Sequence, residues 1–395
     1  MKYPVPEHIL LAMALMEDGG FSPYLVGGCV RDHIMGKVPN DYDITVDADP
    51  CEIYEIFSKK GYKAEQKGKQ FGTVVVYSDG GEIEITPHRT EGSYSDSRHP
   101  DDVRFVKDIR QDLARRDFTV NALAMDSNFN IIDEFNGIED MDKKIIRCIG
   151  DPYIRFGEDA LRILRAMRFA ARFGFDIDIC TKDAMVKQKD GLKNISAERI
   201  REELFGILNA PYAYKVLCES ADVLTEIIRG FCPDEYLLYD GKDTISSLFS
   251  CIYKNSYDNF CLVCEKLKLR SEEYEALRTM HRLYNEILTR DGRKVLFDDK
   301  TKIALCEYKT EYICKVFAFS GSMCRNFFEY LESGIYTISK LAVSGGDIAG
   351  LGLFPKNETS KILKLILKHV ACGEIENTKG AVTDYLIALS ENKSE

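Results

Sequence analysis

The chain lacks any long apolar run. Across its 395 residues, no stretch of about 18 consecutive apolar residues occurs, the length that suggests a membrane-spanning helix. Its first residues also lack the charged-then-apolar pattern of a secretory leader. These two absences predict a soluble protein that has no membrane partner.

The cysteines lack the arrangement of a disulfide framework. Thirteen are present, an odd number scattered along the chain, as expected for small buried side chains in a reducing compartment. Cys261 and Cys264 form the only Cys-x-x-Cys pair, and no second pair accompanies them, so packing is favoured over a zinc site. The predicted location is therefore the cytoplasm.

An excess of basic residues is also missing, since the formal net charge is −11. Affinity for nucleic acid depends on local Lys and Arg rather than on the total. Five arginines crowd into residues 155–172, with Lys143, Lys144 and Arg147 just upstream. The sequence thus allows a basic face on an acidic protein.

Two kinds of periodicity divide the chain. Short β-rich runs alternate with helical patterns in the first ~130 residues, whereas the pattern after Asp151 is helical almost to the end. The strand candidates are residues 24–26, 41–46, 73–77, 82–86, 103–106 and 122–125, with a glycine turn between the third and fourth. Breaks are expected at Pro152, Pro211, Pro233 and Gly321. This predicts an α+β head followed by an all-α remainder.

A glycine pair near the first strand is followed by two aspartates. Gly27 and Gly28 would let a phosphate approach the backbone at a helix start. Asp41 and Asp43 are two apart in a strand-like segment, so both side chains would leave the same face. Two carboxylates beside a phosphate suit Mg²⁺. The alternative is a solvated turn that merely carries two aspartates.

The predicted hairpin offers a third carboxylate. Glu82 and Glu84 lie on the face opposite Ile83 and Ile85. Either glutamate could complete a metal site with the aspartates, or both could simply face solvent.

Five motifs occur in order along residues 20–205. They are the Gly27-Gly28 turn with Asp41-x-Asp43, Arg115-Arg116-Asp117 with Asn121, Gly150-Asp151-Pro152, the arginine-rich segment 155–174 with Glu158-Asp159 and Arg162, and Glu198-Arg199 with Glu203. Together they resemble the bacterial tRNA nucleotidyltransferase and poly(A) polymerase family, most closely its CCA-adding members.

The resemblance implies a polymerase-β-like nucleotidyltransferase head with a mixed sheet, followed by an elongated helical neck, body and tail. The expected bounds are 1–137 for the head, 138–210 for the neck, 211–330 for the body and 331–395 for a tRNA-binding tail.

The resemblance also implies a reaction. Two Mg²⁺ ions would be held by Asp41 and Asp43, with Glu84 preferred over Glu82 as the third catalytic carboxylate. CTP and ATP would be the substrates, and nucleotidyl transfer to RNA would be in line, with release of pyrophosphate. The expected nucleotide-binding residues are Gly27, Gly28, Arg31, Arg116, Asp117, Asn121, Glu158, Asp159, Arg162, Arg165 and Arg168.

Glu158, Asp159 and Arg162 are expected to share one face of a helix. An Asp acceptor beside an Arg fork complements the pairing edge of a base, and in the family this motif replaces a nucleic-acid template. The alternative is an ordinary surface ion pair, which contributes only about 0.3–0.5 kcal/mol. Glu198, Arg199 and Glu203 are expected to brace that helix at the start of another, after the N-cap Ser196.

Two segments favour complete CCA addition over a half enzyme. Residues 90–103 match the family's loop needed for the terminal A, and residues 68–74 resemble the CCA-adding members. No His-Asp dipeptide occurs, so an appended phosphohydrolase is not expected. The tRNA acceptor end and elbow are the expected partners, with no obligatory protein partner. A poly(A) polymerase, a CC- or A-adding enzyme, a small-molecule nucleotidylyltransferase and an inactive nucleotide-binding regulator remain alternatives.

Overall fold

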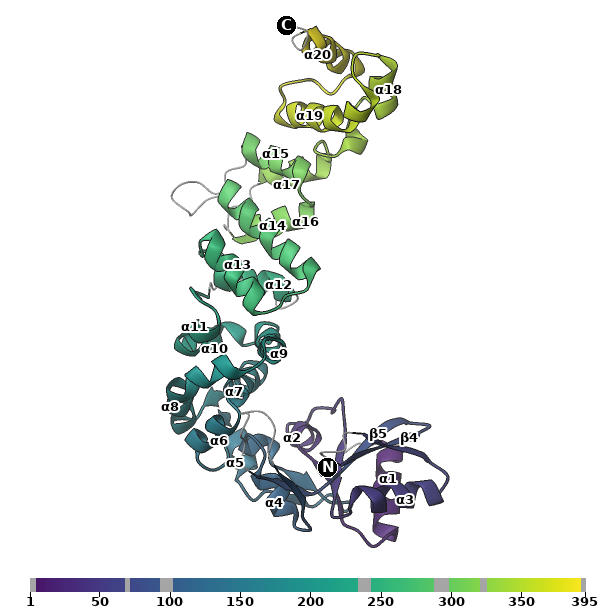
Figure 1. The fold of residues 1–395 in the computed structure, drawn as a ribbon, viewed down its shortest axis with the longest axis vertical. Helices are drawn as coiled ribbons and strands as arrows, with labels where there is room; N and C mark the ends of the chain where they lie inside the picture. The colour runs from purple at the N-terminus through teal and green to yellow at the C-terminus, as the bar shows by residue number, and fades with distance from the viewer. Residues whose placement is uncertain are drawn as a thin grey trace. The chain divides into compact units, whose positions relative to one another are not determined.

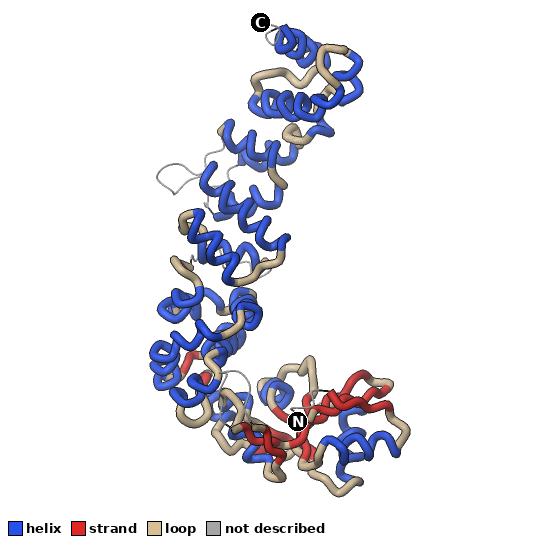
Figure 2. Tube along the Cα trace, in the orientation of Figure 1, coloured by secondary structure: helices blue, strands red, loops and turns tan. Residues whose placement is uncertain are grey.

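The computed structural model describes residues 5–67, 72–92, 102–233, 243–287, 298–319 and 325–391. The chain forms two compact units, Met1–Phe231 and Cys232–Glu395. Figure 1 gives the order of their elements, and Figure 2 shows that the strands described lie in the first unit. No described helix combines the length and apolar character needed to cross a membrane.

A seven-stranded mixed sheet dominates the first unit, in the order β3-β4-β5-β2-β1-β8-β9. Neighbours are antiparallel except for the parallel pair β2 and β5. The strands are β1 (Pro23–Val26), β2 (Asp43–Val46), β3 (Lys63–Lys67), β4 (Thr73–Ser78), β5 (Gly81–Pro87), β8 (Ala124–Met125) and β9 (Ile131–Ile132). Two short pairs complete the set, β6 (Arg89–Glu91) with β7 (Val103–Phe105) and β10 (Ile145–Ile146) with β11 (Asp176–Ile177).

Helices α1 (Glu7–Asp18) and α3 (Pro50–Lys59) pack against the sheet (Figure 1). Helix α3 starts with a capping box, in which Asp49 and Glu52 satisfy backbone N–H groups at its first turn. Ile83 and Ile85 of β5 are buried, while Glu82 and Glu84 are exposed. Strand alternation therefore leaves the carboxylates on the face opposite the buried isoleucines.

Helices build the rest of the first unit. They are α2 (Gly28–Ile34), α4 (Ile109–Ala114), α5 (Gly137–Asp142), α6 (Pro152–Glu158), α7 (Leu161–Phe173), α8 (Ile179–Gln188), α9 (Ala197–Leu208), α10 (Ala213–Glu219) and α11 (Ala221–Ile227). Helix α7 packs on α9. It buries Ile163, Leu164 and Met167 completely, which leaves its arginine-bearing face for the site described below.

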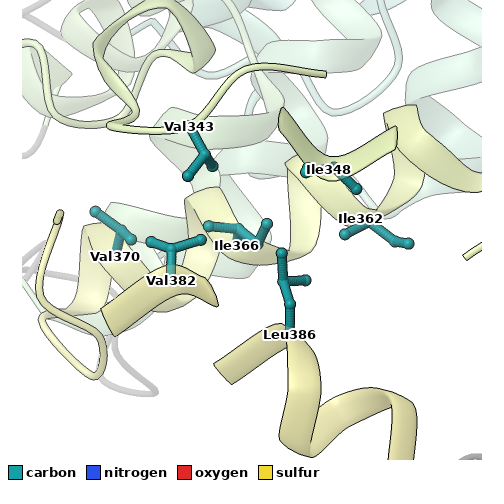
Figure 3. Packing of buried hydrophobic residues seen from close by; sticks show 7 residues of the cluster. All are labelled: Val343, Ile348, Ile362, Ile366, Val370, Val382 and Leu386. Atoms are coloured by element: carbon teal, nitrogen blue, oxygen red, sulfur yellow. The ribbon is translucent and has the colours of Figure 1, made fainter. Parts of the chain in front are cut away.

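The described part of the second unit contains helices and loops. Its α-helices are α12 (Thr244–Ile252), α13 (Tyr257–Lys266), α14 (Ser271–Ile287), α15 (Asp299–Glu307), α16 (Thr310–Phe319), α17 (Arg325–Ser333), α18 (Gly345–Gly350), α19 (Thr359–Cys372) and α20 (Lys379–Glu391). Seven apolar side chains from the last three helices and the segment before them form one cluster (Figure 3). Ile366 lies at its centre, between Val382 and Leu386.

Most of the predicted elements are present. The head with a mixed sheet and the helical remainder are confirmed, and every strand candidate matches an observed strand to within two residues. Strand β2 begins at Asp43, so Asp41 precedes the strand and the expectation that both aspartates lie on it was wrong. Strand β3, rich in Lys, Glu and Gln, was not predicted.

The expected breaks are partly testable. Pro152 opens α6, Pro211 lies between α9 and α10, and Pro233 follows the division between the two units. Gly321, residues 68–71 and most of the loop at 90–103 lie outside the described residues. The four-part division into head, neck, body and tail stays a prediction beside the two units observed.

We expect Leu386→Ala to destabilise the helices from α18 to α20. The side chain is fully buried in their cluster, and truncating a buried leucine costs about 2–5 kcal/mol of unfolding free energy. Hydrogen exchange of amides in residues 345–391 measures this change. Ile387→Ala is the matched control, because the neighbouring side chain is 41% exposed. Equal loss of protection in both variants would contradict the packing described.

Candidate active site

A cavity of about 560 Å³ opens in the first unit between the sheet and helix α7. Its wall is strongly basic, since nine of the lining residues are arginines and only three are aspartates. The lining residues are Gly27, Gly28, Arg31, Asp43, Arg89, Arg115, Arg116, Asp117, Asn121, Asp159, Leu161, Arg162, Arg165, Arg168, Phe169, Arg172 and Arg199. Such a surplus of positive charge favours a polyanionic ligand.

The glycine turn forms part of the wall of this cavity. Strand β1 ends at Val26, and Gly27 takes φ = 72° before α2 begins at Gly28. A Cβ on Gly27 would lie 2.8 Å from Nη1 of Arg116. The positive φ favours glycine here, and the absence of a side chain leaves room for the guanidinium of Arg116.

Arg31 is fixed against the same turn. It is 4% exposed, and its Nη1 donates to Oδ1 of Asn121 at 2.5 Å while Nη2 donates to Oδ1 of Asp32 at 2.8 Å. Its guanidinium carbon lies 4.7 Å from the ring centroid of Phe173. These contacts hold the charge at one position before any ligand arrives.

Asp117 and Arg165 form a close ion pair across the cavity. Nε and Nη2 of Arg165 lie 2.8 and 2.6 Å from Oδ2 of Asp117. The other oxygen of Asp117 accepts from the Phe118 amide and from Asn121. Burial acts to raise the pKa of Asp117, but Arg165 and these donors hold it below its ordinary value.

The Glu158-Asp159 segment is a break between two helices. Helix α6 ends at Glu158, Asp159 is extended with φ = −146° and ψ = 102°, and α7 begins at Leu161. The expectation that Glu158, Asp159 and Arg162 share one helical face was therefore wrong. Asp159 is extended instead, and its Oδ1 accepts a hydrogen bond from the Leu161 amide at 3.0 Å.

The contact expected between Glu158 and Arg162 is present. Nη1 of Arg162 donates to Oε2 of Glu158 at 2.6 Å and to the carbonyl oxygen of Arg155 at 3.1 Å. Asp159 and Arg162 line the cavity, whereas Glu158 lies behind Arg162. The carboxylate of Asp159, a hydrogen-bond acceptor, and the guanidinium of Arg162, a donor, therefore border the same cavity.

Arg199 reaches the cavity from α9. Its Nη2 donates to Oδ2 of Asp159 at 2.8 Å, so this arginine touches the acceptor directly rather than only bracing a helix. Glu203, on the same helix, lies 3.0 Å from Nε of Arg168. Ser196 is the N-cap residue of α9, as predicted, although its side chain makes no capping hydrogen bond.

The carboxylates border a second cavity of about 700 Å³, which Asp41, Asp43, Glu82 and Glu84 help to line. Asp43 lines both cavities. It pairs in register with Glu84 across the parallel strands β2 and β5. The pKa of Asp43 is raised, mainly because burial disfavours its charged form. The positive charge of Arg116 acts to lower this pKa, and the negative charge of Asp41 acts to raise it. No group of three His, Cys, Asp or Glu side chains among the described residues is arranged to hold a metal ion unaided.

Sequence reasoning missed several residues of the cavity. Arg89, Arg115, Phe169, Arg172 and Arg199 line it, yet none was predicted to bind nucleotide. Arg115 and Arg172 were visible as members of arginine-rich motifs, and Arg89 as the end of Thr86-Pro87-His88-Arg89. Their convergence depends on contacts between distant segments, which spacing along the chain does not reveal.

Comparison with known proteins agrees with this geometry. Residues 23–147 match the poly A polymerase head domain, and residues 174–219 match the probable RNA and SrmB-binding site of polymerase A. The CCA-adding enzyme of Bacillus pumilus is 32% identical, over 97% of this chain and 97% of its own. The chain belongs to the CCA-adding enzyme family.

Solved structures of the family have the same fold. The CCA-adding enzyme of Bacillus stearothermophilus, in complex with CTP, is 28% identical, with a TM-score of 0.69, and the match covers 100% of this chain and 99% of that one. The Thermotoga maritima enzyme, complexed with tRNA, is 22% identical with a TM-score of 0.73, covering 98% and 96% of the two chains. The second likeness concerns the fold alone.

We expect Arg165→Gln to lower the unfolding free energy by about 3 kcal/mol near neutral pH, because it leaves the buried Asp117 carboxylate without its charged partner. Since the folded pKa of Asp117 is depressed, its stabilising effect is complete above the ordinary pKa of an aspartate. It is lost as pH falls through the folded value. Urea unfolding of both proteins at several pH values measures the difference, which should shrink in acid.

Arg172→Gln is the matched control on the same helix. Its side chain is 51% exposed and lies 3.9 Å from Asp32, so its loss should cost less than about 1 kcal/mol. A pH-independent difference for Arg165→Gln, or an equal cost for both variants, would contradict the role given to the Asp117–Arg165 pair.

Proposed function

We propose that the chain adds and repairs the 3′-terminal CCA of tRNA from CTP and ATP, without a nucleic-acid template. The observation that carries this is one cavity lined both by a glycine turn and by Asp159 with Arg162. Its basic wall suits a nucleoside triphosphate, and the pair suits the edge of a base. CTP in the complex of the Bacillus stearothermophilus relative is consistent with this ligand class.

The triphosphate belongs at the glycine turn. Gly27 and Gly28 line the cavity without side chains, and Arg31 and Arg116 supply positive charge beside them. Asp117 and Asn121, which are hydrogen-bonded to each other, would contact the sugar. Binding there would bring the phosphate chain to Asp43, which lies on the border of the two cavities.

The base belongs at the helix break. Asp159 offers carboxylate oxygens and Arg162 offers guanidinium donors, and these complement the donors and acceptors on the pairing edge of cytosine or adenine. Arg162 is held by Glu158 at 2.6 Å, and Asp159 by Arg199 at 2.8 Å. Base choice would therefore depend on protein side chains of fixed orientation. Arg165 and Arg168, each paired with a carboxylate, extend the basic wall between the two ends.

The carboxylates fit Mg²⁺ in the way typical of nucleotide-dependent enzymes. This ion usually takes one or two protein carboxylates and completes its shell with water and substrate phosphates. Asp43 lines the same cavity as Asp41 and is in register with Glu84. Two bound Mg²⁺ ions would lower the pKa of the RNA 3′-hydroxyl and stabilise the charge of the leaving pyrophosphate.

The acceptor RNA belongs on the other side of Asp43. The second cavity is bordered by the acidic residues of β2 and β5 and by the start of α1. A terminal ribose there would meet the α-phosphate across the Asp43 side chain. The acceptor end of tRNA would thus reach the head, and the helices after residue 210 would contact the elbow through the shape of its backbone. In this proposal the head, neck, body and tail span 1–137, 138–210, 211–330 and 331–395, and the enzyme acts in the cytoplasm without an obligatory protein partner.

The decisive assay incubates the protein with Mg²⁺ and tRNA transcripts that lack the last three, two or one nucleotides, with CTP and ATP singly and together. Completion of CCA, and arrest after it, is the expected result. Addition of only CC, only A, or a long A tail would reassign the chain to the corresponding sister activity. Absence of any incorporation into RNA would contradict the proposal.

We expect Glu84→Gln to reduce nucleotide addition at least about 100-fold, because several kcal/mol of metal-dependent stabilisation depend on the carboxylate in register with Asp43. Glu82→Gln is the control. Glu82 is in register with Tyr77 rather than with a metal candidate and lies 3.8 Å from Lys67, so its loss should change the rate only slightly. Initial rates at saturating and limiting Mg²⁺ measure both. The reverse ranking would make Glu82 the third carboxylate.

A further inference from the structure

A buried carboxylate that belongs to none of the predicted sites lies behind the phosphate end of the cavity. Asp112 is the fourth residue of α4 and is 0% exposed. The flanking residues Ile109 and Leu113 belong to a core cluster with Val26 and Ala124. The carboxylate is therefore anchored by packing against the strands β1 and β8.

Asp112 binds three residues that line the cavity. Its Oδ1 accepts from Nε and Nη2 of Arg115 at 2.9 and 2.8 Å, and from the Arg89 amide at 3.2 Å. Its Oδ2 accepts from Nη2 of Arg116 at 3.1 Å. All three arginines line the cavity, whereas Asp112 itself does not.

The charged and polar neighbours of Asp112 favour the ionised form of its carboxylate. Burial alone acts to raise the pKa of Asp112, but Arg115, Arg116 and the Arg89 amide hold it below its ordinary value. The carboxylate is thus ionised at neutral pH. A buried carboxylate with fixed donors orients guanidinium groups more strictly than solvent would.

Arg116 is the arginine whose position matters most for the phosphates. Its Nη1 lies where a Cβ on Gly27 would approach to 2.8 Å, and its charge acts on Asp43. Arg116 therefore extends from Asp112 to the glycine turn and towards the carboxylate pair. An arginine without this anchor would sample several rotamers and would pay ordering entropy on binding.

We propose that Asp112 is a positioning residue for the polyphosphate end of the nucleotide, acting through Arg115 and Arg116. This inference rests on the proposed function, because it assumes a nucleoside triphosphate in the cavity. Asp112 touches neither substrate nor reacting atoms. Its contribution is to keep two positive charges at the phosphate site before the nucleotide arrives.

The test compares CTP with cytidine 5′-monophosphate, both measured by calorimetry with Mg²⁺ and without RNA. Asp112→Asn keeps the shape of the side chain but removes its charge and turns an amide towards an arginine donor. The Kd for CTP should rise about tenfold or more, the scale of one lost charge-assisted contact. The Kd for the monophosphate should change less than about twofold, since it carries fewer phosphate charges.

Asp140→Asn is the matched control. Asp140 is 4% exposed and binds Arg147 and Thr119, none of which lines the cavity. Both Asp140→Asn and Asp112→Asn should lose thermal stability. In Asp140→Asn, however, the ratio of CTP affinity to monophosphate affinity should stay at the wild-type value. The same change in ratio for both variants, or an unchanged ratio for Asp112→Asn, would overturn the positioning role.

A second route covers the case in which Asp112→Asn fails to fold. Arg116→Gln, in which Asp112 is intact, should produce the same selective loss of CTP affinity. Asp112→Glu should retain most of the wild-type affinity for CTP. Equal loss of both ligands in Arg116→Gln would overturn the proposal. A wild-type protein that binds no CTP would instead contradict the proposed function, so the two failures are distinguishable.

Discussion

The pairing of arginines with buried carboxylates is the constraint on which the site depends. Nine arginines around one cavity would repel one another without compensation. Asp112, Asp117, Glu158, Asp159 and Glu203 each lie against at least one of them. The cavity can therefore keep its shape while it is empty and still present a positive surface to a polyanion.

These pairs also connect elements that the chain brings from far apart. Arg155 of α6 donates to the carbonyl oxygens of Ala114, the last residue of α4, and of Arg116 at 3.4 and 2.7 Å. The same arginine donates to Glu158, which in turn holds Arg162. The phosphate end and the base end of the cavity are thus joined by a continuous series of charge-assisted hydrogen bonds, which favours a preorganised site.

Sequence patterns predicted the elements better than their junctions. The hairpin of β4 and β5 followed from alternating apolar residues around a glycine turn, and the glycines before α2 from their position after a strand. Gly157 lies two residues before the break at Asp159, but one glycine within a helical pattern does not by itself predict a break. The break is associated with the Arg199 contact, 40 residues away in sequence, so local propensity could not predict it. Asp112 was missed, and Arg199 was expected only to brace a helix, because the partners of both residues are defined only by the fold.

A crystal structure with CTP and Mg²⁺ tests the central claim most directly. We expect cytosine against Asp159 and Arg162, the phosphates between Gly27 and Arg116, and Asp43 beside the α-phosphate. Asp112 should keep both of its arginine contacts in that complex. A nucleotide bound outside this cavity, or one bound with its base at the glycine turn, would contradict the account.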